Sequence, residues 1–326
     1  MREDNDKLEH IPNQTSSDPN NQFRQPALHS TAIMNIEVDL TMALNFVNPF
    51  HPFDLQPLLP RDYSLFDLPS VFDIDIVAVH GMNIEGNICH YQDDWATNDG
   101  QWIRRTLPDY TGYLYRAMLF SYNRAFSMDE RDTRLSEHSD RLLTVLQARR
   151  QNDPQRPLMF ICHDLGGVVV KDALVKASQN PLYKDVADST KLLVFFNTPH
   201  NNVASVARNL AESSVRVPEE ELIRKLEAEC HKAEERAQSD GMSRRLWRNR
   251  LVVNFYATNT YLGQKLIVEK KSTLVGLPDT REKHLPIYAD HVSMCKLGPS
   301  NDEACRMVMK TISMEMDRAL AMFESN

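Results

Sequence analysis

Short apolar runs recur along the chain from Phe72 onward and are separated by longer stretches in which apolar residues repeat with a helical period. The clearest runs are Asp75–Val79, Leu158–Ile161, Leu192–Phe196 and Leu251–Phe255, and a weaker one follows Ala117. Short runs of this kind are typical of buried parallel strands. Strands that alternate with helices predict an α/β fold, a mostly parallel sheet with helices on both faces.

Three stretches predict helices because their apolar residues share one face. The last of them begins with Ser300 and Glu303, spaced as in a capping box, and we expect Ser300 to cap it. The shared faces are Leu135, Leu142, Leu143 and Leu146; Val169, Val170, Ala173, Leu174 and Ala177; and Cys305, Val308, Met309, Ile312, Met316, Ala319, Leu320 and Phe323.

The chain divides near residue 70. Residues 1–70 form an N-terminal extension, of which 1–26 are rich in Asn, Gln, Asp, Ser and Pro and are predicted to be disordered. Residues 71–326 form the α/β domain. A charged segment, Pro218 to Arg250, is inserted between two core strands with Leu222 and Leu226 as its narrow apolar stripe. It is predicted either as a solvated surface helix or, over about 203–248, as a helical lid above a pocket.

Composition narrows the function. Lys and Arg total 37 against 45 Asp and Glu, a net charge of −8, which argues against nucleic-acid binding. No apolar run approaches the roughly 18–20 residues that span a bilayer, and the N-terminus is too polar for a secretory signal. The five cysteines form no C-x-x-C pair. We therefore expect a soluble, cytoplasmic protein with a small-molecule substrate, no cofactor and no metal; its oligomeric state stays open.

The segment Leu158–Val168 carries the candidate chemistry. A strand, a tight turn of small residues and a helix in succession resemble the nucleophile elbow, G-x-S-x-G, with Asp164 where the serine stands. A carboxylate there can attack an electrophilic carbon and form an ester that water then hydrolyses. Aspartate is also a good helix N-cap, so a structural role for Asp164 is the alternative.

Other residues complete a possible site. His80-Gly81 follows an early strand, so the N–H groups of Met82 and Leu165 are the expected oxyanion hole. His291 precedes the last helix, where a catalytic histidine belongs in the order nucleophile, acid, histidine. The acid is open, and the sequence does not choose among its candidates Glu269, Asp279, Glu282 and Asp290.

Several motifs together resemble the lipase-like "serine active site containing" branch of the α/β-hydrolases over roughly residues 72–323, in what looks like a fungal stand-alone version. The resemblance implies an α/β-hydrolase fold. Two departures stand out: Asp164 replaces the elbow serine, and Ala257 replaces a glutamate that the resemblance makes the triad acid. The motifs are Val79–Gly81, Trp102–Pro108, Phe160–Lys171, Val194–His200, Ile267–Glu269 and Ala289–Lys296.

A shorter likeness joins residues 163–167 to the His-Asp-x-Gly-Gly elbow of epoxide hydrolases and haloalkane dehalogenases, in which Asp is the nucleophile. Three hypotheses follow. Asp164 and His291 act as nucleophile and general base on epoxides or similar electrophiles in a biosynthetic (secondary-metabolic) pathway; Asp164 is the base of a cyclisation or elimination; or the chain is an inactive pseudo-hydrolase that binds a ligand or partner. Ordinary serine-esterase chemistry is not expected.

Overall fold

The computed structural model describes residues 55–58, 72–85, 90–97, 100–122, 134–263, 266–298 and 302–324. The segment expected to be disordered, 1–26, lies outside these residues, as does the rest of the N-terminal extension apart from 55–58. No helix in the described part of the chain has the length and apolarity needed to cross a membrane.

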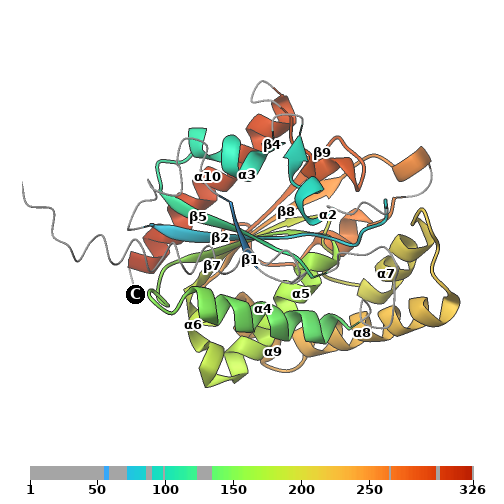
Figure 1. Ribbon diagram of the computed structural model, residues 1–326, viewed down its shortest axis with the longest axis horizontal. Helices are drawn as coiled ribbons and strands as arrows, with labels where there is room; N and C mark the ends of the chain where they lie inside the picture. Colours follow the sequence, from blue (N-terminus) through green and yellow to red (C-terminus); the bar gives the residue numbers. More distant parts are fainter. Residues whose placement is uncertain are drawn as a thin grey trace, which may run out of the picture. The chain divides into compact units, whose positions relative to one another are not determined.

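A seven-stranded sheet forms the centre of the domain (Figure 1). Its strands lie in the order β1-β5-β2-β6-β7-β8-β9; all neighbours from β5 onward in this order run parallel, and β1 pairs antiparallel with β5 at one edge. All five predicted runs are strands of this sheet, and the fold is that of an α/β-hydrolase. The strands are β1 (Leu55–Leu58), β2 (Ile74–Val79), β5 (Tyr115–Phe120), β6 (Leu158–His163), β7 (Thr190–Phe196), β8 (Leu251–Ala257) and β9 (Glu282–Ile287).

Helices cover both faces of the sheet, with α3 and α10 on one and α4, α5, α6, α8 and α9 on the other (Figure 1). Successive residues of a strand point to opposite faces of the sheet and so belong to two separate hydrophobic cores. In β2, Val77 and Val79 pack under α4 and α5, whereas Ile76 and Ala78 pack under α10. The helices are α2 (His90–Asp93), α3 (Trp102–Arg105), α4 (Leu135–Arg149), α5 (Leu165–Gln179), α6 (Lys184–Ser189), α7 (Val203–Glu212), α8 (Glu220–Gln238), α9 (Met242–Trp247) and α10 (Glu303–Glu324).

Shorter elements join these. A two-stranded sheet pairs β3 (Ala96–Thr97) with β4 (Gly100–Gln101). Single 3₁₀ turns follow several strands and helices. They are η1 (Leu107–Asp109), η2 (Pro181–Tyr183), η3 (Tyr261–Gly263), η4 (Lys270–Thr273) and η5 (Ser293–Cys295).

The apolar stripe of α10 is buried as predicted from Cys305 to Leu320, and Phe323 is half-buried. The start of this helix is described from Asp302 onward. The helix begins at Glu303, and the carboxylate of Asp302, directly before it, accepts a hydrogen bond from the Cys305 N–H at 3.1 Å. Ser300, the residue expected to cap, lies outside the described residues.

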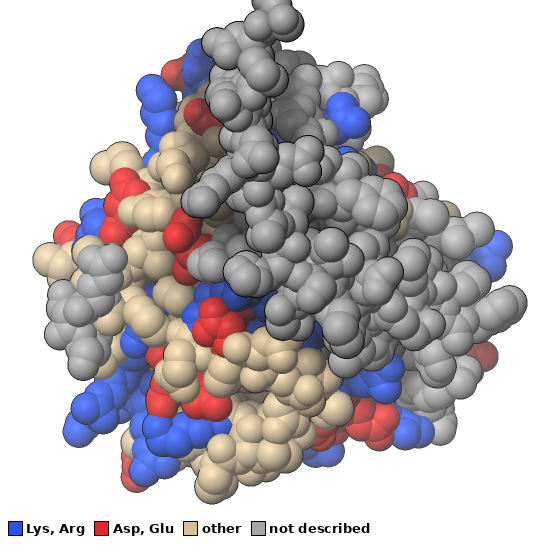
Figure 2. Space-filling view, turned by 60° about the vertical axis from the view of Figure 1, so that its left-hand side comes forward, with Lys and Arg blue, Asp and Glu red and all other residues tan. Residues whose placement is uncertain are grey.

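The charged segment forms α8 and α9, and the wider range 203–248 also includes α7. The buried residues of α8 are Ile223, Leu226, Cys230 and Ala233, whereas Leu222, expected in the apolar stripe, is only half-buried. The apolar face of α8 packs against α7 and on α4 and α5, so much of the segment covers the sheet's helical layer. On the face seen in Figure 2, basic and acidic side chains are interspersed, without a large patch of one sign.

A buried ion cluster anchors the start of the central strand β2. Asp75 is fully buried and pairs with Arg150, which follows α4, with Arg116 on β5 at 2.9 Å and with Arg156 at 3.2 Å. A buried carboxylate needs such partners because burial without compensation is costly. This cluster lies at the edge where the parallel strands begin, away from the elbow where β6 ends.

Candidate active site

The elbow is a sharp turn between β6 and α5. Asp164 alone separates the two, and its backbone lies at φ 50° and ψ −127°, a conformation that non-glycine residues rarely adopt. Its N–H donates to Phe196 O at 2.9 Å, and its carbonyl accepts from Gly167 N at 3.1 Å and Thr198 Oγ1 at 3.0 Å. These bonds on both sides hold the strained residue in place.

Glycines allow the backbone segments around the turn to touch. A Cβ on Gly166 would lie 2.2 Å from His80 O, and one on Gly81 would lie 2.7 Å from the Cβ of Asp164. No side chain fits at either position without moving backbone or the site itself. The loop after β2 therefore passes directly over the elbow and brings the Met82 N–H to Asp164.

The carboxyl group of Asp164 occupies the place expected for an oxyanion. Its Oδ2 accepts from Met82 N at 3.0 Å, and the Leu165 N–H also hydrogen-bonds the carboxyl group. Its Oδ1 is buried and has no hydrogen-bond partner among the residues that the structure describes. Burial raises the pKa of Asp164 to about 6, although the neighbouring His163 and the two N–H groups oppose the rise.

His163 lies at the site, although no catalytic role was expected for it from the sequence. Its Nδ1 lies 2.9 Å from Asp94 Oδ2, and its Nε2 lies 3.0 Å from the carbonyl oxygen of His291. Burial alone would lower the pKa of His163, but the Asp94 carboxylate outweighs it and the net shift is upward. Both ring nitrogens face oxygen acceptors, an arrangement that favours the doubly protonated ring. Positive charge on this ring lowers the pKa of the neighbouring Asp164.

Asp94 also came without a sequence signal. It lies after the short α2, is buried, and accepts from the Gly81 N–H at 3.2 Å through the same Oδ2 that meets His163. Asp94 therefore links the loop after β2 to the end of β6. Only the folded chain brings residues 81, 94 and 163 together.

His291 faces the elbow. It is buried, its Nε2 lies 3.9 Å from Asp164 Oδ2, and its ring lies 4.8 Å from that of His163. Its Nδ1 lies 3.0 Å from the side-chain Nδ2 of Asn197, the residue that follows β7. Asn197 Oδ1 in turn accepts from the Ala257 N–H at 3.0 Å. An amide thus stands where a triad would place its acid.

The acids considered from the sequence have other surroundings. Glu269 and Asp279 are exposed. Glu282 is buried, but it begins β9, and its carboxylate accepts from three backbone N–H groups of residues 275–277 and from Asn254. Asp290 accepts from the N–H groups of residues 292 and 293 and so shapes the turn after His291. Each of these carboxylates is therefore accounted for without a part in a triad.

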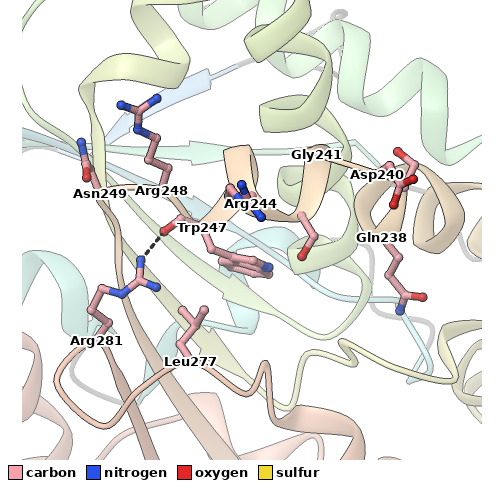
Figure 3. Close-up of a pocket in the computed structure, with 11 residues that line it drawn as sticks. Gln238, Asp240, Gly241, Arg244, Trp247, Arg248, Asn249, Leu277 and Arg281 are labelled. Atoms are coloured by element: carbon pink, nitrogen blue, oxygen red, sulfur yellow. Dashed lines mark hydrogen bonds between the residues drawn. The ribbon is translucent and has the colours of Figure 1, made fainter.

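A separate hollow lies at the other edge of the sheet. A cavity of about 500 Å³ lies beside α9, near the start of β8 and β9. Trp247 and Leu277 lie near its centre, and Arg281 donates to Trp247 O at 2.8 Å (Figure 3). Ligands of parallel α/β sheets bind beyond the carboxyl ends of the strands, which is the edge of Asp164.

The geometry allows two kinds of chemistry. Oδ1 of Asp164 can attack an electrophilic carbon or accept a proton, since Oδ2 is held by the Met82 N–H. A serine-type acyl transfer lacks its hydroxyl nucleophile here. Within the described residues, no three His, Cys, Asp or Glu side chains are grouped closely enough to hold a metal ion.

No family model matches the chain. It is similar to protein SERAC1 of Homo sapiens, 30% identical over 167 residues, which cover 48% of this chain and 24% of that protein. Protein SERAC1 of Danio rerio is 25% identical over 253 residues, 68% of this chain and 36% of the relative. The chain thus spans about a quarter to a third of the length of these relatives.

Similar solved structures include an esterase of Pyrobaculum calidifontis, at 12% identity and a TM-score of 0.49, covering 89% of this chain and 93% of the other. Carboxyl esterase 2 of Tuber melanosporum is 11% identical with a TM-score of 0.47, and the match covers 84% of this chain and 89% of the other. Vibralactone cyclase is 10% identical with a TM-score of 0.47, and the match covers 94% of this chain and 93% of the other.

Proposed function

We propose that the chain is an enzyme of α/β-hydrolase fold whose reactive group is the carboxylate of Asp164 and which acts on a small organic substrate. The reaction is the opening of an epoxide-type electrophile, or a cyclisation or elimination, and not serine-esterase hydrolysis. Asp164 attacks or removes a proton through Oδ1, and His291 lies on the opposite side of the reacting atoms. The Met82 N–H holds Oδ2, and the N–H groups of Met82 and Leu165 stabilise negative charge on the carboxyl group.

One observation carries this proposal. Asp164 is fully buried and its backbone is strained, yet its carboxyl oxygen Oδ1 has no hydrogen-bond partner in the described part of the chain. A carboxylate with only a structural role is normally satisfied on both oxygens, because a buried unpaired acceptor costs about 1–3 kcal/mol. Strain and unsatisfied polarity together are typical of functional positions. Asp164 bears both.

The test is covalent capture in water enriched in heavy oxygen. Excess protein is mixed with styrene oxide and with a panel of other epoxides, halides and activated esters, and its peptides are analysed by tandem mass spectrometry. Cleavage after Arg150 and Lys171 releases a peptide with two carboxyl side chains, Asp153 and Asp164. A probe adduct or heavy oxygen on Asp164, absent from Asp153 and from Asp164→Asn protein, is the expected result for attack by the carboxylate.

Turnover without adduct or label would assign Asp164 the role of base. The alternative function, an inactive binding module, is favoured by the complete burial of the Asp164 side chain. An absence of adduct, label and turnover across the whole panel would contradict the enzymatic proposal. It would leave binding, measured as a ligand-dependent rise in Tm, as the function to examine.

A further inference from the structure

The hydrogen bonds of Asn197 decide which ring nitrogen of His291 carries the proton. The Ala257 N–H can only donate, so the amide oxygen of Asn197 must face it, as it does at 3.0 Å. The amide NH₂ therefore faces Nδ1 of His291 at 3.0 Å. Because NH₂ also only donates, Nδ1 is the acceptor, and the proton of the neutral ring lies on Nε2.

Turning the amide over would not rescue the other tautomer. The flipped group would set its NH₂ against the Ala257 N–H and leave that buried donor without its acceptor. Asn197 is itself buried, so water does not replace the lost bond. The orientation is therefore fixed by backbone at the end of β8 and not by His291.

We infer that Asn197 is a positioning residue that holds His291 as an Nε2–H donor toward the substrate, so that the site transfers protons within a substrate and does not activate water. This inference rests on the proposed role of Asp164 as the reactive carboxylate. An imidazole that accepts a proton from water needs a lone pair on the nitrogen facing the reaction. In a serine-protease triad, replacing the acid by its amide leaves the geometry intact, yet costs about 10⁴-fold because the tautomer is wrong.

The implied reaction is an isomerisation of a neutral carbonyl compound, ring closure included. Oδ1 of Asp164 removes a proton from a carbon next to the carbonyl, or from a hydroxyl group. The electron pair left behind moves to the carbonyl oxygen or forms the new bond, and the oxygen accepts a hydrogen bond from Nε2–H of His291. The Asp164 carboxyl then returns the same proton to another substrate atom, so no water, oxidant or reductant is consumed.

The tautomer is measured directly by ¹⁵N NMR of the full chain labelled in its histidine rings. Signals of His291 are assigned by their loss in His291→Gln, and we expect Nε2 protonated and Nδ1 bare. Asn197→Asp places a carboxylate opposite Nδ1 and should move the proton there. Asn259→Asp makes the same charge change at an exposed residue and should leave the wild-type pattern.

The chemical consequence is tested by measuring how fast an ester formed between Asp164 and styrene oxide is hydrolysed. An ester formed on Asp164 should persist in the wild type and be hydrolysed at least 100-fold faster in Asn197→Asp. Wild-type His291 protonated on Nδ1, a proton that stays on Nε2 in Asn197→Asp, or equal hydrolysis in the two proteins would each overturn the inference. An absence of ester in both proteins would instead contradict nucleophilic attack by Asp164, while the NMR result still decides the tautomer.

Discussion

Replacing Asp164 by asparagine should stabilise the protein at neutral pH. The ordinary carboxyl pKa of 3.8 rises to about 6 in the folded chain, chiefly through burial. Between these values the folded state keeps a proton that the unfolded chain has released, so the free energy of unfolding falls as pH rises. Above pH 6 both states are ionised, and the folded protein bears the whole penalty.

The magnitude follows from the shift. A rise of roughly two pKa units, at about 1.4 kcal/mol per unit, lowers the free energy of unfolding by about 3 kcal/mol at pH 7.5 and by only about half of that at pH 5. Asp164→Asn should recover this loss. The substituted side chain would keep a carbonyl oxygen for the Met82 N–H, and asparagine tolerates positive φ. For a domain of this size, about 3 kcal/mol corresponds to a rise in Tm of about 6–12 °C.

Urea unfolding of the wild type and Asp164→Asn at pH 5 and pH 7.5 measures the effect. Asp317→Asn, at an exposed position on α10, is the matched control and should change stability by less than about 0.5 kcal/mol. A neutral or destabilising Asp164→Asn at pH 7.5 would refute the reasoning. So would a gain in stability that does not grow between pH 5 and pH 7.5.

Two further substitutions, one beneath the site and one in the ion cluster at the start of β2, are tested by urea unfolding at pH 7.5. Gly167→Ala should lose about 1–3 kcal/mol, because its methyl group would lie 2.3 Å from Thr198 Oγ1, whereas Gly112→Ala, with nothing within 4 Å, should be close to neutral. Asp75→Asn should lose about 3–5 kcal/mol, since it leaves the buried guanidinium of Arg150 without its counter-charge, and a loss below about 1 kcal/mol would contradict that account.

Local patterns were enough to predict most of the sheet. The strands β2, β6, β7 and β8 are buried on both faces, so their sequences are continuous apolar runs. β9 escaped prediction because it is an edge strand, with the polar and proline-containing sequence Glu-Lys-His-Leu-Pro-Ile. Because β9 has a neighbouring strand on one side only, most of its residues are half-buried.

The succession of β6, the turn at Asp164 and α5 was predictable for the same reason, since strand, turn and helix are contiguous in sequence. The partners of His291 and Asp164 were not. Asn197 reaches the site because the sheet order places the ends of β6, β7 and β8 side by side. Asp94 follows α2 and reaches the site through its contacts with Gly81 and His163. No spacing rule relates residues 94, 163, 197 and 291. Only carboxylates were considered from the sequence as partners of His291, so the amide of Asn197 was not among them.

Two buried carboxylates of this chain differ in how fully their surroundings satisfy them. Glu282 receives four N–H donors and fixes the loop that precedes β9. Asp164 is equally enclosed, yet one of its oxygens has no donor in the described residues, its backbone is strained, and burial raises its pKa toward neutrality. The neighbouring His163 opposes this rise of the pKa without hydrogen-bonding Oδ1. Asp164 thus bears the cost of burial and strain at the edge of the sheet where ligands of parallel α/β sheets generally bind, and this supports the proposed chemistry over a role as helix cap.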